Sequence, residues 1–166
     1  MHKALLLICA VACTLLSTAQ FLENKGQVVD LNQNFHPEVD YYAGVGNASV
    51  FFEKDKVVFN FREKEEFDFS QPKFQNNKDL RDSIKSTLGS TFHRLDLQLI
   101  GTNSEVEIRG EEKTDHYTNF FLNKRENIRN VSSFNTVRYH DVYPDIDLIF
   151  HFTENGLKYD FILKEG

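Results

Sequence analysis

The stretch from Ile146 to Leu163, IDLIFHFTENGLKYDFIL, decides the fold class. Apolar and polar residues alternate with a period of two on both sides of Asn155-Gly156, a dipeptide that accepts the positive φ angles of a tight hairpin turn. The pattern predicts an antiparallel β-hairpin with one buried face. The residues expected on that face are Ile146, Leu148, Phe150 and Phe152 in the first strand and Leu157, Tyr159, Phe161 and Leu163 in the second.

The same alternation recurs in shorter stretches upstream of this hairpin. It runs over residues 57–61, 95–99 and 105–109, and each stretch presents one apolar face. Residues 50–53 and 56–62 are separated by Lys54-Asp55, and they predict a second hairpin.

Residues 63–88 interrupt the alternation. Leu80, Ile84 and Leu88 recur at every fourth position and are followed by Gly89, which predicts a short amphipathic helix with a glycine stop. We therefore predict an all-β fold, an antiparallel sandwich or half-open barrel of about nine strands with one short helical insertion.

Composition narrows the class of protein. The chain has 166 residues, of which 40% are hydrophobic, and this is the usual size of one domain with its own core. It carries 25 acidic against 19 basic residues, a formal charge of -6. Nucleic-acid binding depends on clustered Lys and Arg that neutralise phosphates, so this balance argues against such a partner.

The first residues predict export. His2 and Lys3 precede an apolar run from Ala4 to Leu16, and small residues follow up to Ala19. This is the pattern of a signal peptide over residues 1–19, because a membrane-spanning helix needs about twenty apolar residues. A membrane anchor and lipid modification of Cys13 are the competing interpretations. Cleavage near Ala19 leaves a single β-rich domain over residues 20–166, secreted or on the outer cell surface.

Both cysteines of the chain, Cys9 and Cys13, lie inside the predicted signal. The mature chain therefore contains no disulfide, thiolate metal site or cysteine nucleophile. No transmembrane segment is expected in it either. The histidines show no metal-ligand spacing, and we assign no catalytic, cofactor-binding or metal-ligating residue.

Three carboxylates, Asp141, Asp145 and Asp147, flank Tyr143-Pro144. Such a group is compatible with a calcium site or with acid–base work on a glycan. Proline and aspartate are also typical turn residues, and we favour the turn interpretation.

Aromatic doublets form the other candidate site. Tyr41-Tyr42 and Phe51-Phe52 each place one ring on either face of a strand. Exposed Tyr41 and Phe51 would give a platform for carbohydrate binding, whereas strands buried on both faces explain the doublets equally well.

Several blocks resemble a family of unknown function found at the front of large secreted bacterial proteins. In this chain they are FLENKGQ at residues 21–27, HRLDLQLIG at 93–101, VEIRGEE at 106–112, residues 117–122, VRYHDVYPDIDLIF at 137–150 and GLKYDF at 156–161. The resemblance implies that the domain precedes propeller-type repeats, immunoglobulin-like modules and a type IX secretion sorting domain. The family commonly has a glycine where Asp145 stands and a tryptophan near Ile128, so we expect the turn geometry and one core contact to differ in this chain.

The resemblance implies an exported, surface-associated module without chemistry of its own. Relatives run on past the last strand, so we expect the domain to be truncated at its C-terminus. We predict a non-catalytic structural or interaction module, adhesive in character, that contacts other domains of a larger surface protein or extracellular glycans or proteins. The alternatives are a carbohydrate-binding module and a calcium-dependent or hydrolytic carboxylate site.

Overall fold

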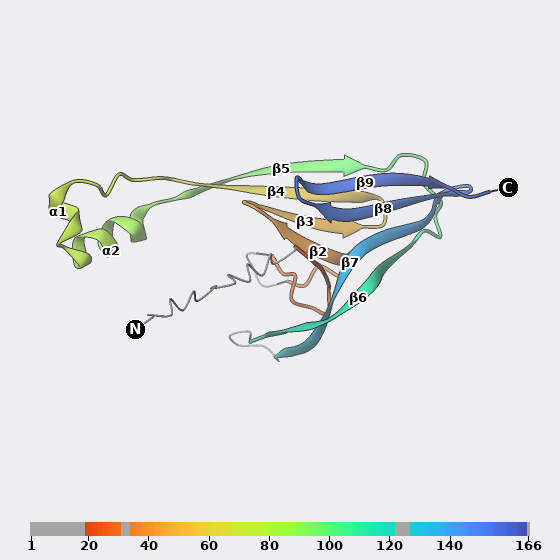
Figure 1. Cartoon of the computed structure of the whole chain (residues 1–166), viewed down its shortest axis with the longest axis horizontal. Helices are drawn as coiled ribbons and strands as arrows, with labels where there is room; N and C mark the ends of the chain where they lie inside the picture. Colours follow the sequence, from red (N-terminus) through yellow and green to blue (C-terminus); the bar gives the residue numbers. More distant parts are fainter. Residues whose placement is uncertain (1–18, 31–33, 122–126, 166) are drawn as a thin grey trace, which may run out of the picture.

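A computed structural model describes residues 19–30, 34–121 and 127–165. Nine strands in these ranges form one antiparallel sheet, which curls into a half-barrel with two short helices at its periphery (Figure 1). The predicted all-β fold is therefore confirmed. The elements are β1 Phe21–Glu23, β2 Val39–Val45, β3 Ala48–Glu53, β4 Lys56–Lys64, α1 Pro72–Gln75, α2 Lys78–Thr87, β5 Ser90–Gln98, β6 Glu107–Phe120, β7 Ile128–Tyr143, β8 Ile146–Thr153 and β9 Gly156–Leu163.

Strand β7 joins the two walls of the half-barrel. The strand order is β5-β4-β3-β2-β1-β7-β8-β9, and β6 pairs with the other edge of β7. Ser133 and Phe134 of β7 pair with β1, whereas the segment from Thr136 to Tyr143 pairs with β8. Since β6 occupies one edge, β1 and β8 must share the opposite edge in succession. The sheet divides at this point, and its two branches face each other.

Aromatic rings fill the space between the two walls. The ring of Phe52 on β3 lies 5.4 Å from that of Phe21 and 5.1 Å from that of Phe150 on β8. All three rings are almost completely buried, and each such burial is worth about 2 to 3 kcal/mol. Tyr139 of β7 donates a buried hydrogen bond from its hydroxyl to the carbonyl of Glu53, at 2.9 Å. Burial raises the pKa of Tyr139 well above its ordinary value, so the phenol stays protonated and donates.

The predicted buried face is confirmed for β8 and is wrong for β9, where only Leu157 packs against the core and the other three residues of that face are exposed. Leu148 and Phe150 are 1% exposed and belong to the core. Their partners in register are Phe161 and Tyr159, which lie on the same side of the sheet but are 47% and 55% exposed. The expectation of burial fails because β9 ends the strand order, and no further described strand packs beside it.

Residues 65–89 leave the sheet as a long excursion, since β4 continues to Lys64, two residues beyond the predicted strand, and β5 begins at Ser90. Figure 1 shows α1 and α2 at the far end of the ribbon formed by β4 and β5, away from the other strands. Helix α2 confirms the predicted helix, and its N-terminus is capped by the side chain of Asn77, which accepts a hydrogen bond from Leu80 N–H at 3.0 Å. The single-turn helix α1 was not predicted. The rings of Phe67, Phe69 and Phe74 meet at centroid distances of 4.9 to 5.7 Å and form a small separate cluster.

The predicted signal peptide falls almost entirely on residues 1–18, outside the described residues. Among the helices that the structure describes, none is long and apolar enough to cross a membrane.

Gly110 of β6 gives the first prediction. A Cβ atom at this position would lie 2.5 Å from Cγ of the Phe134 ring, so Gly110→Ala must displace that ring or the strand. We expect a loss of about 1 to 3 kcal/mol in the free energy of unfolding, measured by urea titration of the purified chain. Gly44→Ala on β2 is the matched control, because nothing lies within 4 Å of its added methyl group. Equal stability of the two variants would contradict this packing.

Candidate functional site

Two of the three candidate carboxylates, Asp141 and Asp147, meet at Lys164, and Asp145 lies apart from them. Pro144 and Asp145 form the two-residue turn between β7 and β8, where Asp145 is exposed. Asp141 lies in an irregular stretch of β7 and Asp147 lies in β8, where only 5% of the residue is exposed. Among the described residues there is no group of three or more His, Cys, Asp or Glu that could hold a metal ion.

Asp145 adopts φ 60°, the left-handed conformation that glycine favours. With proline before it, this is the geometry of a type II turn, which requires a positive φ at its third residue. The backbone at Asp145 is therefore one that glycine adopts readily. Aspartate tolerates this conformation better than most residues.

Asp147 is the centre of a charged network. Its side chain accepts hydrogen bonds from the backbone N–H of Asp141 at 2.8 Å and from Arg138 Nη1 at 3.3 Å, and it lies 3.0 Å from Lys164 Nζ. Lys164 also bonds the Asp141 carboxylate, and Arg138 donates from Nε to Glu111 at 2.8 Å. Asp141, Asp147 and Glu111 thus already have cationic partners.

The pKa of Asp147 moves in the direction opposite to that of a general acid. Burial acts to raise this pKa, but the hydrogen bonds from Asp141 N–H and Lys164 and the positive charges of Lys164 and Arg138 outweigh burial. The pKa of Asp147 therefore lies below its ordinary value, whereas a catalytic carboxylic acid needs a raised one. The network stabilises the junction of β7, β8 and the end of β9.

The aromatic doublets divide between the two faces of the sheet. Tyr41 pairs with Phe52 and Tyr42 pairs with Phe51, so the members of each pair share a face. Tyr41 and Phe52 face the core. The ring centroids of Tyr41 and Phe134 are 5.7 Å apart, and the two rings meet edge to face. The proposed use of Tyr41 as an exposed platform is therefore wrong. Phe51 is on the outer face, where its ring stacks on that of Tyr42 with 6.4 Å between the ring centroids.

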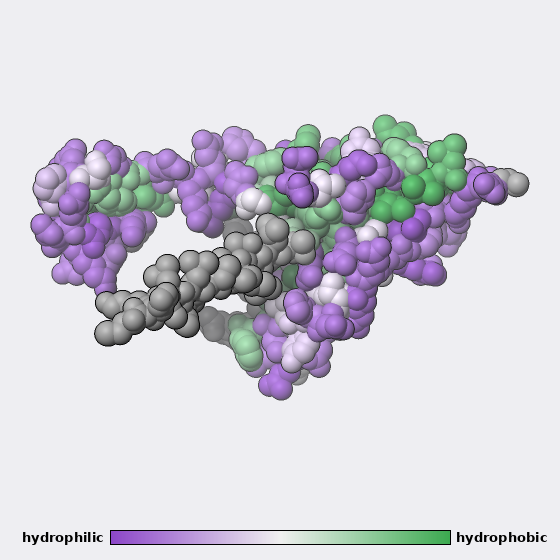
Figure 2. Space-filling model, in the orientation of Figure 1, coloured by the Kyte–Doolittle hydropathy of each residue, from purple (hydrophilic) through white to green (hydrophobic). Residues whose placement is uncertain are grey.

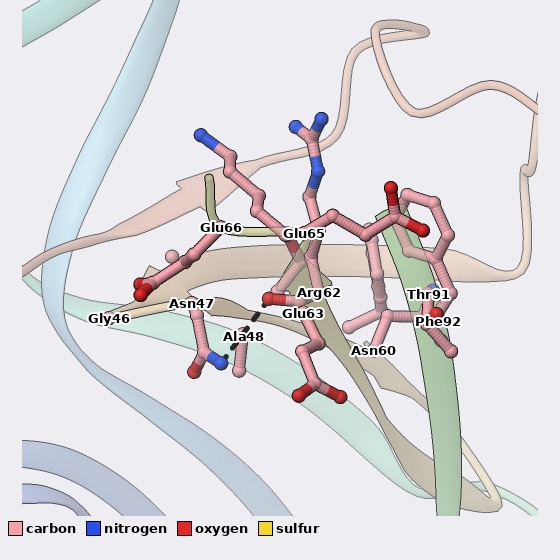
Figure 3. Close-up of a pocket in the computed structure, with 14 residues that line it drawn as sticks. Gly46, Asn47, Ala48, Asn60, Arg62, Glu63, Glu65, Glu66, Thr91 and Phe92 are labelled. Carbon is pink, nitrogen blue, oxygen red and sulfur yellow. Dashed lines mark hydrogen bonds between the residues drawn. The ribbon is translucent and has the colours of Figure 1, made fainter. Parts of the chain in front are cut away.

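Phe51 lines an open groove on the outer face of β2 to β5. Figure 3 shows Arg62 and Phe92 in this groove, with the carboxylates of Glu63, Glu65 and Glu66 directed away from one another. The Arg62 guanidinium lies 5.9 Å from the centroid of the Phe92 ring. Two aromatic rings and dispersed polar groups suit a flat polar ligand better than a reaction centre.

Apolar side chains are exposed along two edge strands of the half-barrel, β9 and β5. On β9, Tyr159, Phe161 and Leu163 are 55%, 47% and 74% exposed, although they face the core side. On β5, Leu95 and Leu97 are 57% and 39% exposed, and they pair with Phe59 and Val57 of the core side. Figure 2 shows apolar surface gathered at the end of the molecule where β9 lies.

Comparison with known proteins identifies the family of this chain. The family model described as "Domain of unknown function (DUF7948)" covers residues 21–166. The chain belongs to this family. No curated protein and no solved structure matches. The DUF7948 match begins at Phe21, the first residue of β1, and it includes every described strand.

The sequence pattern did not predict Arg138 and Lys164, the two cations of the charged network around Asp147. Arg138 sits in a strand block and Lys164 follows the last strand, and nothing in their spacing links them to Asp147. They meet because β7, β8 and β9 are neighbours in the sheet. The only available signal was the excess of charged residues close to Tyr143-Pro144.

The second prediction concerns Asp147. Asp147→Asn leaves Arg138 and Lys164 without their shared anion, and we expect a loss of about 2 to 4 kcal/mol at pH 7. The folded pKa is lowered, so the ionised carboxylate stabilises the fold above the unfolded pKa of about 3.9, and this contribution disappears as the pH falls through the folded pKa. The difference between the two proteins in urea titrations should therefore shrink in acid.

Asp145→Asn is the matched control, because Asp145 is exposed and asparagine also tolerates a positive φ. This variant should retain the stability of the parent protein within about 0.5 kcal/mol. A destabilisation by Asp147→Asn that grows in acid would contradict the assignment.

Proposed function

We propose that the DUF7948 domain is a non-catalytic structural and interaction module of an exported cell-surface or secreted bacterial protein, adhesive in character. The observation that carries this proposal is the pair of strand edges, β5 and β9, whose core-facing apolar side chains remain exposed. Contiguous exposed apolar surface on a folded protein marks a site of interaction.

Strand β9 lacks several of the features that protect a sheet edge. Natural edge strands are kept apart by proline, by very short length, by charged residues that point inward or by charged side chains along the edge. Strand β9 has eight residues and no proline, and its inward side carries Leu157, Tyr159, Phe161 and Leu163. An extended protein segment that pairs with this edge would satisfy its backbone groups and cover its apolar side chains.

The exported location rests on the sequence. The signal pattern of residues 1–19 and the resemblance to front domains of large secreted proteins both support it. The partners that we propose are other domains of a larger surface protein or extracellular proteins and glycans. The acidic balance of the chain, with 25 acidic and 19 basic residues, disfavours nucleic acid.

Site-specific cross-linking tests the proposal. A photo-reactive residue is placed at Tyr159 on β9, or at Tyr117 on β6 as a control of similar exposure, at 63%. The full chain is expressed in an exporting Gram-negative bacterium and irradiated. We expect a protein adduct outside the inner membrane from position 159 and none from position 117. Equal yields at both positions, or adducts only in the cytoplasm, would contradict it.

A second candidate function is carbohydrate binding by the outer groove of Figure 3. Phe51 and Phe92 line the groove together with Asn47, Asn60 and Arg62. Aromatic faces with amide and guanidinium donors around them are a suitable surface for sugar rings.

A glycan array of the purified chain tests this candidate. Phe51→Ala and Phe92→Ala should each reduce the signal by about tenfold, the loss of roughly 1.4 kcal/mol of ring contact. Tyr117→Ala, far from the groove on β6, should leave it unchanged. An array without reproducible binding by the folded parent protein would exclude this function for the sugars displayed.

A further inference from the structure

The free edge of β9 has a sequence that complements itself. Among the described strands, β9 pairs only with β8, through the register from Ile146↔Leu163 to Thr153↔Gly156. The inference below rests on the proposed function, which assigns the exposed edges to interaction. It concerns which occupant the β9 edge takes.

Backbone geometry restricts how two such edges can meet. Alternate residues of an edge strand direct their N–H and C=O groups outward, so two antiparallel copies of β9 align only with residues of the same parity opposite each other. A two-fold axis then passes beside one residue of β9. The central choices are Lys158, Tyr159 and Asp160.

Charge selects one of these registers. An axis at Lys158 places two ammonium groups opposite each other, and an axis at Asp160 does the same with two carboxylates. An axis at Tyr159 places Lys158 of each copy opposite Asp160 of the other, which gives two pairs of opposite charge. Like charges directly opposite destabilise a sheet and unlike charges stabilise it, by about 0.2 to 1 kcal/mol for each pair. We propose that two copies of this chain pair antiparallel through β9, centred on Tyr159.

The apolar side of the strand agrees with this register. It places Tyr159 opposite its own copy and Leu157 opposite Phe161. These side chains face the core side of each half-barrel, and Tyr159 and Phe161 are half exposed in the single chain. Pairing brings the rings together across the axis, where aromatic and aliphatic cross-strand pairs stabilise a sheet.

The edge of β5 carries a similar pattern but is a poorer candidate. On β5, Arg94 and Asp96 flank Leu95, as Lys158 and Asp160 flank Tyr159. Arg94 already holds Asp96 through two hydrogen bonds, at 2.6 and 2.9 Å, and such a bidentate pair has little to gain from a partner. Lys158 Nζ lies 2.9 and 3.1 Å from the two carboxylate oxygens of Asp160, but its ammonium is flexible and not a planar fork, so it can turn across the axis.

Charge exchange provides the test, with sedimentation velocity as the measurement. The purified parent chain should sediment as a dimer that dissociates on dilution. Lys158→Asp and Asp160→Lys should each raise the dimer dissociation constant by about tenfold or more, because each replaces two attractions by two repulsions. The double variant Lys158→Asp/Asp160→Lys should return to within about threefold of the parent value, since it restores both pairs.

Mixing distinguishes lost pairing from lost folding. The two single variants have complementary strands, so an equimolar mixture should form a heterodimer although neither variant dimerises alone. Arg94→Asp on β5 is the matched control and should leave the dimer unchanged. A monomeric parent chain, a mixture that stays monomeric, or a dimer that is lost in Arg94→Asp would overturn the proposal. If the parent is monomeric while position 159 cross-links to another protein, only this inference fails and the proposed function stands.

Discussion

The structure depends on the way in which one long strand serves two walls. Strand β7 keeps β6 along one edge, and its opposite edge is shared by β1 and then β8. A strand can hold two successive neighbours on one edge only if those neighbours diverge, so the sheet must fold back on itself. The rings of Phe21, Phe52 and Phe150 then meet in the space between the walls. The hydrogen bond from Tyr139 to Glu53 fixes the separation of the walls at the same point.

Charged side chains stabilise another part of the sheet, where β7, β8 and the end of β9 meet. Asp147 is buried, and a buried carboxylate is tolerated only when its charge and its lone pairs are satisfied. Arg138 from β7 and Lys164 beyond β9 supply that compensation. The cluster of acidic residues near Tyr143-Pro144 therefore belongs to the architecture of the strand junction. Its geometry favours a structural role over metal binding or acid–base chemistry.

Much of the fold could be predicted because alternation reports the side of a strand on which each residue lies. The hairpin of β8 and β9 and the helix α2 followed directly from such patterns. Alternation does not report whether another strand covers that side, so the exposure of Tyr159 and Phe161 was missed. The meeting of Arg138, Lys164 and Asp147 depends on the neighbour order of β7, β8 and β9, and no local pattern records that order.

Helices α1 and α2, at the far end of β4 and β5, are only loosely coupled to the sheet. The ring cluster of Phe67, Phe69 and Phe74 is separate from the main core, and α2 buries none of its residues. Little apolar contact then couples these helices to the rest, so their amide protons should exchange with solvent through local opening, long before the sheet gives way. We therefore expect residues 65–89 to have a much lower local stability than the sheet. Substitutions in these residues should then change the free energy of unfolding of the sheet very little.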